Sequence, residues 1–132
     1  MLIGVVAAVG LATDAGLAFS ARRSLQGIAD AAATAGAQQI NVELYRQSNG
    51  EMVELDPQAA YDAAVARIQA ASGGGRFSID GYSVTVSTTR VDVAIQGRAR
   101  IAFLPAVLPI ARTVPVKATA WALPRYGIAS AQ

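Results

Sequence analysis

The 132-residue sequence contains neither cysteine nor histidine. Without cysteine there is no disulfide framework and no thiolate chemistry. The absence is compatible with an oxidising compartment and with the cytosol. Without histidine the chain lacks the usual general base at neutral pH and the commonest metal ligand. A Ser-His-Asp type of active site is therefore excluded, and the sequence predicts no enzyme, no catalytic residue, no cofactor and no metal site.

Charge and aromatic residues are also sparse: the net charge is +2, and aromatic side chains make up 6% of the residues. The 11 basic residues are scattered along the sequence, and only Arg22 and Arg23 are adjacent to each other. A nucleic-acid binder usually shows a clustered basic stripe with aromatic platforms, so nucleic acid is excluded as a partner. With 53% hydrophobic residues, the globular part is expected to have a thin core of Ala, Val and Ile.

Acids and glycines each form one cluster. The acids Glu51, Glu54 and Asp56 could hold a hard cation, but the calcium-loop consensus is missing, and such a cluster is more often a solvated linker. Gly73–Gly75 lies in the reverse of the strand-to-helix order that phosphate-binding loops need, so it is predicted to be a helix stop and hinge.

The dominant feature that is present is a long hydrophobic run at the N-terminus. Leu2–Ala12 has no polar side chain, and the run resumes after Asp14 until Arg22 and Arg23. About 20 such residues form roughly 30 Å of helix, the thickness of a bilayer's hydrocarbon core. We expect one helix over Leu2–Gln39, whose first half is in lipid or in a filament core. A carboxylate there is costly, so Asp14 is expected to pair with a basic group or N-terminal amine of a neighbour.

Small side chains recur at every fourth position of this run and form a ridge along the helix. Such a ridge lets a second helix backbone come close, which is how helices associate where no water drives them together. The alternative is a simple anchor that is rich in Ala and Gly. With the acid included, the candidate residues for helix packing and assembly are Gly4, Ala8, Ala12, Asp14, Gly16 and Ser20.

Beyond Arg23 the helix is predicted to become amphipathic. Apolar or small residues recur there at spacings of three and four and describe one stripe, which consists of Leu25, Ile28, Ala32, Gly36 and Ile40. The helix is expected to end near Tyr45, before a turn over Arg46–Gly50.

A second helix is predicted from Asp56–Pro57 to Ser72, because Asp accepts hydrogen bonds from free amides and Pro fits the first helical turn. Its narrow apolar stripe, suited to lying on a sheet, consists of Tyr61, Ala64, Val65, Ile68 and Ala71.

From Phe77 onward the hydrophobic period becomes two, which indicates half-buried strands. The predicted strands are Phe77–Ile79, Tyr82–Val86, Val91–Ile95, Ala99–Phe103 and Val114–Leu123. Asp80–Gly81 suits a tight hairpin turn, Ser87–Arg90 a looser one, and Gln96–Gly97 a bulge or a turn. Short links favour antiparallel pairing, so the expected fold is α+β: a long helix, a short helix and an antiparallel sheet of three to five strands.

The segment Phe103–Ala111 is apolar but contains Pro105 and Pro109, so it cannot supply a complete sheet ladder. It forms either a buried loop or short helix, or an exposed apolar lip, and we favour the lip because exposed apolar patches tend to be contact sites. The candidate residues for contact with a partner are Leu104, Val107, Leu108, Ile110 and Trp121.

The predicted N-terminal helix contains three characteristic segments, residues 13–26 (TDAGLAFSARRSLQ), 29–33 (ADAAA) and 35–37 (AGA). In these segments it resembles the N-terminal helix of the TadE/TadG-like proteins of Tad-type (Flp) pilus assembly. The resemblance implies a pilin-like, bitopic protein that acts as a minor pilin or pseudopilin in an adhesive pilus or a secretion machine. It also implies that the globular part lies outside the cytoplasmic membrane, whereas the basic pair after the hydrophobic run alone favours the opposite orientation.

Three regions are expected: 1–21 as the membrane or filament-core half of the helix, 22–45 as its amphipathic continuation, and 46–132 as a small α+β head. The leading hypothesis is a non-catalytic structural or assembly subunit of a Tad-type pilus or related secretion machine. Its expected partners are other pilin-like subunits, including copies of itself, the pilus or secretion platform, and the cytoplasmic membrane. The alternative is a membrane-anchored envelope module whose head binds a ligand or surface.

Overall fold

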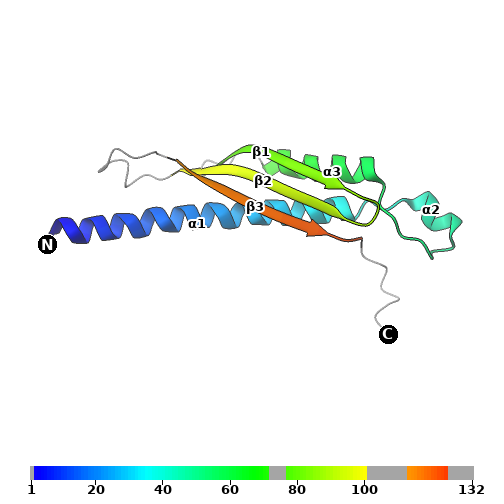
Figure 1. The fold of residues 1–132 in the computed structure, drawn as a ribbon, viewed down its shortest axis with the longest axis horizontal. Helices are drawn as coiled ribbons and strands as arrows, with labels where there is room; N and C mark the ends of the chain where they lie inside the picture. Colours follow the sequence, from blue (N-terminus) through cyan, green and yellow to red (C-terminus); the bar gives the residue numbers. More distant parts are fainter. Residues whose placement is uncertain (1, 72–76, 101–112, 125–132) are drawn as a thin grey trace, which may run out of the picture.

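The protein is a long helix packed against a three-stranded antiparallel sheet, with two shorter helices (Figure 1). The computed structural model describes residues 2–71, 77–100 and 113–124, and within them the side chains from residue 15 onward. The elements follow in the order α1 (Leu2–Ala37), α2 (Val42–Gln47), α3 (Pro57–Ala71), β1 (Phe77–Val86), β2 (Val91–Arg100) and β3 (Thr113–Ala122). The predicted α+β class is confirmed.

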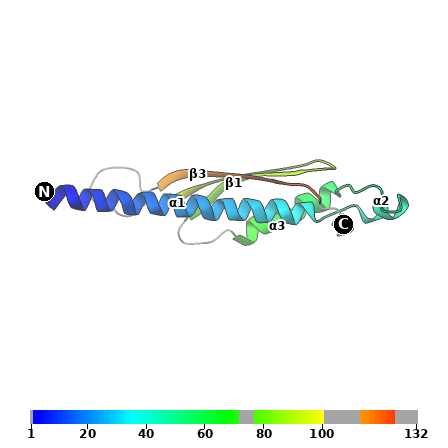
Figure 2. The same cartoon turned by 90° about the horizontal axis from the view of Figure 1, so that it is seen from below.

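The layers are simple. Both α1 and α3 lie on one side of the sheet, and the opposite face of the sheet carries no helix (Figure 2). The N-terminal part of α1 extends past the end of the sheet, so that the molecule is a rod with the sheet beside its second half (Figure 1). At 1.5 Å per residue, the 36 residues of α1 make a helix of about 54 Å.

The long helix is confirmed, but the prediction that it ends near Tyr45 is wrong. It ends at Ala37, and the chain then forms an isolated antiparallel bridge between Ile40 and Leu55. Asn41 begins the separate helix α2, because its Oδ1 accepts a hydrogen bond of 3.0 Å from the amide of Leu44. The hydrophobic periodicity alone predicts that the helix continues to Tyr45. The helix instead ends earlier, because the chain forms the bridge to Leu55 and a new helix cap at Asn41.

The turn after α2 and the start of α3 are as predicted. Asn49 and Gly50 have positive φ angles of 54° and 81°, the left-handed conformation that these residue types tolerate. At the start of α3, Asp56 Oδ1 accepts a hydrogen bond of 3.2 Å from the amide of Ala59, with Pro57 in the first turn.

The packing of α3 differs from the prediction. The predicted stripe members Ala64 and Ile68 are buried, but the first buried residue is Ala60, whereas Tyr61 is 42% exposed. The helix packs chiefly along α1 and makes fewer contacts with β1 of the sheet. Because its buried residues are mostly alanines, α3 is suited to close contact with another helix rather than to covering a sheet.

The sheet has the order β1-β2-β3 with antiparallel pairs, and Ser87–Arg90 forms the predicted link between β1 and β2. The predicted hairpin turn at Asp80–Gly81 is wrong: β1 continues through these residues, with a bulge opposite Gln96. The predicted strands 77–79 and 82–86 are therefore one strand, and 91–95 and 99–100 belong to one strand as well. Residues 101–112 lie outside the described part of the chain.

Strand β3 follows the predicted alternation closely. Val116 and Ala118 are buried towards the helices, while Lys117, Thr119 and Trp121 are exposed on the other face. In β2 the alternation is complete over Val91–Ala99, which makes it the central strand in burial as well as in position. The hydrophobic period thus predicted the orientation of both strands.

The core consists of a few large side chains surrounded by alanines. The largest fully buried side chains are Leu25, Leu55, Ile68, Ile95, Val91 and Val93. Each contributes about 1.5–3 kcal/mol through burial of apolar surface. Alanines 29, 32 and 33 of α1 are also buried, which brings the helix backbone close to its neighbours and confirms the expected thin core.

Two glycines mark the closest approaches. A Cβ at Gly36 would stand 3.0 Å from the carbonyl oxygen of Ala60 in α3 and 3.1 Å from Val91 Cγ1 in β2. A Cβ at Gly97 would collide with the carbonyl oxygen of Ser78 and come within 3.2 Å of Leu25 Cδ1. The absence of a side chain at these two positions lets α1, α3 and the sheet meet.

Candidate assembly and binding surfaces

The described end of the predicted ridge lies on the side of α1 that faces away from the sheet. Gly16 and Ser20 are exposed, and nothing lies within 4 Å of a Cβ built at Gly16. Since an α-helix turns by about 100° per residue, Gly16 lies roughly opposite the buried Leu25. The buried face of α1 begins at Ala21, so this side of the preceding turn has no partner within the described residues.

The other predicted assembly residues, Gly4, Ala8, Ala12 and Asp14, belong to α1, but their side chains lie outside the described residues. Neighbouring Phe19 is 69% exposed, the largest exposed fraction recorded for a large hydrophobic side chain in the described part of the chain. Sequence reasoning did not single out Phe19, because it counted this residue as the last member of a uniformly apolar run.

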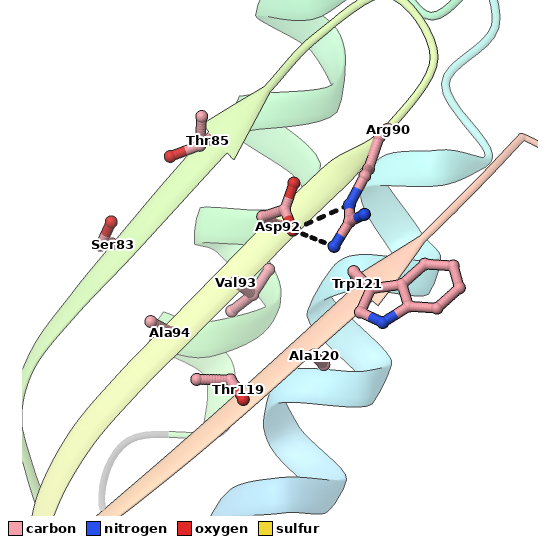
Figure 3. Close-up of a pocket in the computed structure, with 9 residues that line it drawn as sticks. All are labelled: Ser83, Thr85, Arg90, Asp92, Val93, Ala94, Thr119, Ala120 and Trp121. Carbon is pink, nitrogen blue, oxygen red and sulfur yellow. Dashed lines mark hydrogen bonds and ion pairs between the residues drawn. The ribbon is translucent and has the colours of Figure 1, made fainter.

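The uncovered face of the sheet carries one organised cluster, around Trp121 (Figure 3). Arg90 Nη2 lies 2.8 Å from Asp92 Oδ1, and Arg90 Nε donates to the same oxygen at 2.9 Å. The Arg90 guanidinium carbon lies 4.8 Å from the centroid of the Trp121 ring, within the range of a cation–π contact. Asp92 and Trp121 are direct neighbours across β2 and β3.

These three side chains border a shallow pocket of about 340 Å³ that is open to solvent. Its other polar lining comes from Ser83 and Thr85 on β1 and Thr119 on β3, as Figure 3 shows. The ion pair cancels the charge of the site, and Trp121 remains 60% exposed. An exposed aromatic ring beside hydroxyl groups and a neutralised ion pair suits an uncharged ligand that bears hydroxyl groups.

Sequence reasoning identified only Trp121 in this cluster. Arg90 was assigned to a turn and Asp92 to the polar face of a strand, and nothing in the sequence pairs them with a residue almost thirty positions later. The strand register supplies that link. The predicted lip residues Leu104, Val107, Leu108 and Ile110 lie outside the described residues.

A second pocket lies between α1 and β3, where the helix begins to leave the sheet. It has a volume of about 350 Å³ and is lined by Ala18, Phe19, Arg22, Pro115, Val116 and Lys117. Its two cations come from different elements, and the remaining lining is apolar. Sequence reasoning did not find this pocket, because Arg22 and Lys117 are far apart in the chain.

The described residues contain neither a group of acids that could bind a metal ion nor a helix suited to crossing a membrane. Across residues 2–71, 77–100 and 113–124, no three acidic side chains gather closely enough to hold a metal ion, so Glu51, Glu54 and Asp56 do not form such a group. Among the residues whose side chains the structure describes, from residue 15 onward, no helix is long and apolar enough to cross a membrane.

The geometry defines a class of small α+β proteins with a pilin-like plan, in which a long N-terminal helix extends beyond a compact head with an antiparallel sheet. Residues 1–39 match the model of the family described as "Putative Flp pilus-assembly TadE/G-like". The matched segment is α1 with the two residues that follow it. No curated protein and no solved structure matches the chain.

The resemblance to the TadE/TadG-like group is thus confirmed for the N-terminal helix. That family suggests an envelope location and partners within the pilus machinery, and it is generally non-catalytic.

Proposed function

We propose that this protein is a non-catalytic structural or assembly subunit of a Tad-type (Flp) pilus or a related secretion machine. The carrying observation is that the described end of the small-residue ridge faces away from the head, on a helix that extends past the sheet (Figure 1). The family match over the same helix supports it. The subunit acts by packing its N-terminal helix against other helices.

A small-residue surface suits this task. Gly16 presents no side chain and Ser20 a short one, so a neighbouring helix backbone can approach closely enough for van der Waals contact over several turns. The N-terminal half of α1 needs an environment without water, because the side chains from Leu2 to Ala12 are all apolar and cannot form hydrogen bonds with water. Lipid and a filament core both provide that environment.

The proposal includes an arrangement in the envelope. Residues 1–21 are the half of the helix that enters the cytoplasmic membrane or a filament, and the head lies in the periplasm or outside the cell. The helical continuation of this half ends at Ala37 rather than at residue 45. The partners are other pilin-like subunits, copies of this chain included, and the pilus or secretion platform.

Adding bulk to the ridge tests the proposal. Gly16→Leu and Ser20→Leu are expected to lower incorporation into filaments or envelope complexes at least tenfold, because the added side chain separates the two helix backbones. Ala66→Leu is the matched control, since Ala66 is an exposed small residue on α3 that lines none of the described pockets. Normal incorporation of both ridge variants would contradict the proposed packing.

The acid Asp14 provides an independent test. Asp14 is proposed to pair with a basic group or the N-terminal amine of a neighbouring subunit, since an unpaired carboxylate among apolar helices is costly. Asp14→Leu removes the charge and retains the apolar character of the helix. Incorporation measured by co-purification is expected to fall, whereas unchanged assembly would refute the pairing.

The Trp121 pocket favours a second candidate function: an envelope module whose head binds a ligand. The lining chemistry suits a neutral polysaccharide, which offers apolar ring faces to Trp121 and hydroxyl groups to the polar lining. Retention on immobilised neutral polysaccharide is expected for the full chain and not for Trp121→Ala, with Tyr82→Ala as the exposed aromatic control. Deletion without a pilus or secretion defect would favour this function over assembly.

A further inference from the structure

The pocket between α1 and β3 lies at the base of the head. Ala18, Phe19 and Arg22 from α1 form one wall, and Pro115, Val116 and Lys117 from β3 form the other. The buried face of α1 begins at Ala21, so the pocket stands at the junction between the half of the helix that packs on the sheet and the half that leaves it. This is the level at which a lipid surface would meet the head if the N-terminal half of α1 were inserted.

The pocket carries unbalanced positive charge. Arg22 and Lys117 are both exposed, and within the described residues neither has a hydrogen-bond or ion-pair partner. No acid is among the six lining residues. Two other cations of the sheet are paired, Arg90 with Asp92 at 2.8 Å and Arg98 with Asp80 at 2.9 Å. The two cations at the pocket are therefore available to an external anion.

The charge is placed beside apolar surface. Phe19 is 69% exposed, and with Ala18, Pro115 and Val116 it gives the pocket an apolar lining next to the two cations. Lys and Arg side chains bordering apolar surface are typical of groups that sit at a membrane interface, where the charged end reaches the headgroups and the stem contacts acyl chains. A simple inorganic anion would use the cations and leave Phe19 in water.

We propose that this pocket binds the phosphate group of an anionic phospholipid, with the upper part of an acyl chain against Phe19 and Ala18. Arg22 and Lys117 contact the phosphate, one from each wall of the pocket, and Arg23, the next residue of α1, adds a further positive charge to the same helix. The inference rests on the proposed envelope function, because the apolar half of α1 is what brings the pocket to a bilayer.

Vesicle binding tests the proposal with the full chain and no other subunit. Partitioning is measured into vesicles of phosphatidylcholine alone and of phosphatidylcholine mixed with phosphatidylglycerol. Arg22→Gln and Lys117→Gln are each expected to lower partitioning into the anionic vesicles about fivefold, and the double variant about 25-fold, with partitioning into the neutral vesicles unchanged. Raising the salt concentration is expected to reduce the difference between the two vesicle types.

Arg67→Gln is the matched control. Arg67 is an exposed arginine on α3, away from the pocket, and its loss changes the net charge by the same amount. An equal loss of anionic selectivity in Arg67→Gln would overturn the specific site in favour of general charge attraction. Unchanged selectivity in the double pocket variant would overturn it as well.

Two outcomes separate this inference from the proposed function. If the double pocket variant keeps its lipid selectivity but loses self-association in sedimentation, the pocket binds an acidic segment of another copy, and the lipid proposal is wrong. If Gly16→Leu assembles normally while the pocket variants lose lipid selectivity, the helix-packing function fails and the lipid site stands.

Discussion

At the scale of single residues, the fold depends on positions where a side chain is absent. Gly97 pairs with Ile79 in β1 and with Val116 in β3, and its missing Cβ leaves room for the carbonyl oxygen of Ser78 and the side chain of Leu25. The sequence suggested a bulge or turn at Gln96–Gly97, since glycine in a strand pattern favours either. The glycine instead serves close packing of α1 on β2, which depends on the distance between elements that a one-dimensional pattern does not contain.

Gly97→Ala is expected to lower the free energy of unfolding by about 1–3 kcal/mol, because the added methyl group forces β1 or Leu25 to move in a close-packed core. Chemical denaturation of the full chain measures this loss. Gly81→Ala is the control, since nothing lies within 4 Å of a Cβ built at Gly81, and its change is expected to stay within about 0.5 kcal/mol. Equal stability of the two variants would contradict the close approach at Gly97.

At the scale of elements, local signals were predicted well and long-range ones were not. The cap at Asp56 and the alternation in β3 depend on adjacent residues, and they agree with the structure, whereas the predicted helix stop at Gly73–Gly75 lies outside the described residues. The end of α1 depends on the bridge between Ile40 and Leu55 and on the bond of 2.7 Å from the Asn41 amide to the Glu54 oxygen. Partners that are distant in the chain produce no pattern in the hydrophobic periodicity. The cluster of Arg90, Asp92 and Trp121 was not predicted for the same reason.

Asp56→Ala is expected to lower the free energy of unfolding by about 1 kcal/mol, because the amide of Ala59 loses its side-chain acceptor at the first turn of α3. Asp56→Asn keeps an acceptor oxygen in the same position and is expected to retain most of the stability. Thermal unfolding followed by circular dichroism compares the two variants, and an equal loss in both would mean that the charge rather than the cap stabilises α3.

At the scale of the whole molecule, burial changes along the described part of the continuous helix α1. From Ala21 to Ala37 it supplies buried residues to the head, and before Ala21 its described side chains are exposed or half-buried. The amphipathic stripe after Arg23 was predicted from the sequence, and its members Leu25, Ala32 and Gly36 are buried. The pocket at the junction was not predicted, because it needs β3 beside α1.

Removing residues 1–14 is expected to leave the free energy of unfolding of the head unchanged within about 0.5 kcal/mol, since every described residue of the core lies at Ala21 or later in the chain. Leu25→Ala in the same shortened chain is expected to cost about 2–5 kcal/mol, because it opens a cavity between α1 and the sheet. Denaturant unfolding of the two proteins makes the comparison. A large loss on truncation alone would show that the head depends on the first half of the helix.

Strand β3 is an edge strand within the described residues, and its free edge resists pairing with a foreign chain. Pro115 has no amide hydrogen to offer, Lys117 adds a charge, and the carbonyl of Thr119 already accepts a bond of 2.7 Å from Gln26 Nε2 of α1. Intermolecular sheet extension, the route to amyloid, therefore meets an interrupted ladder. A protein of this shape can be crowded to high local concentration while its strands stay within one molecule.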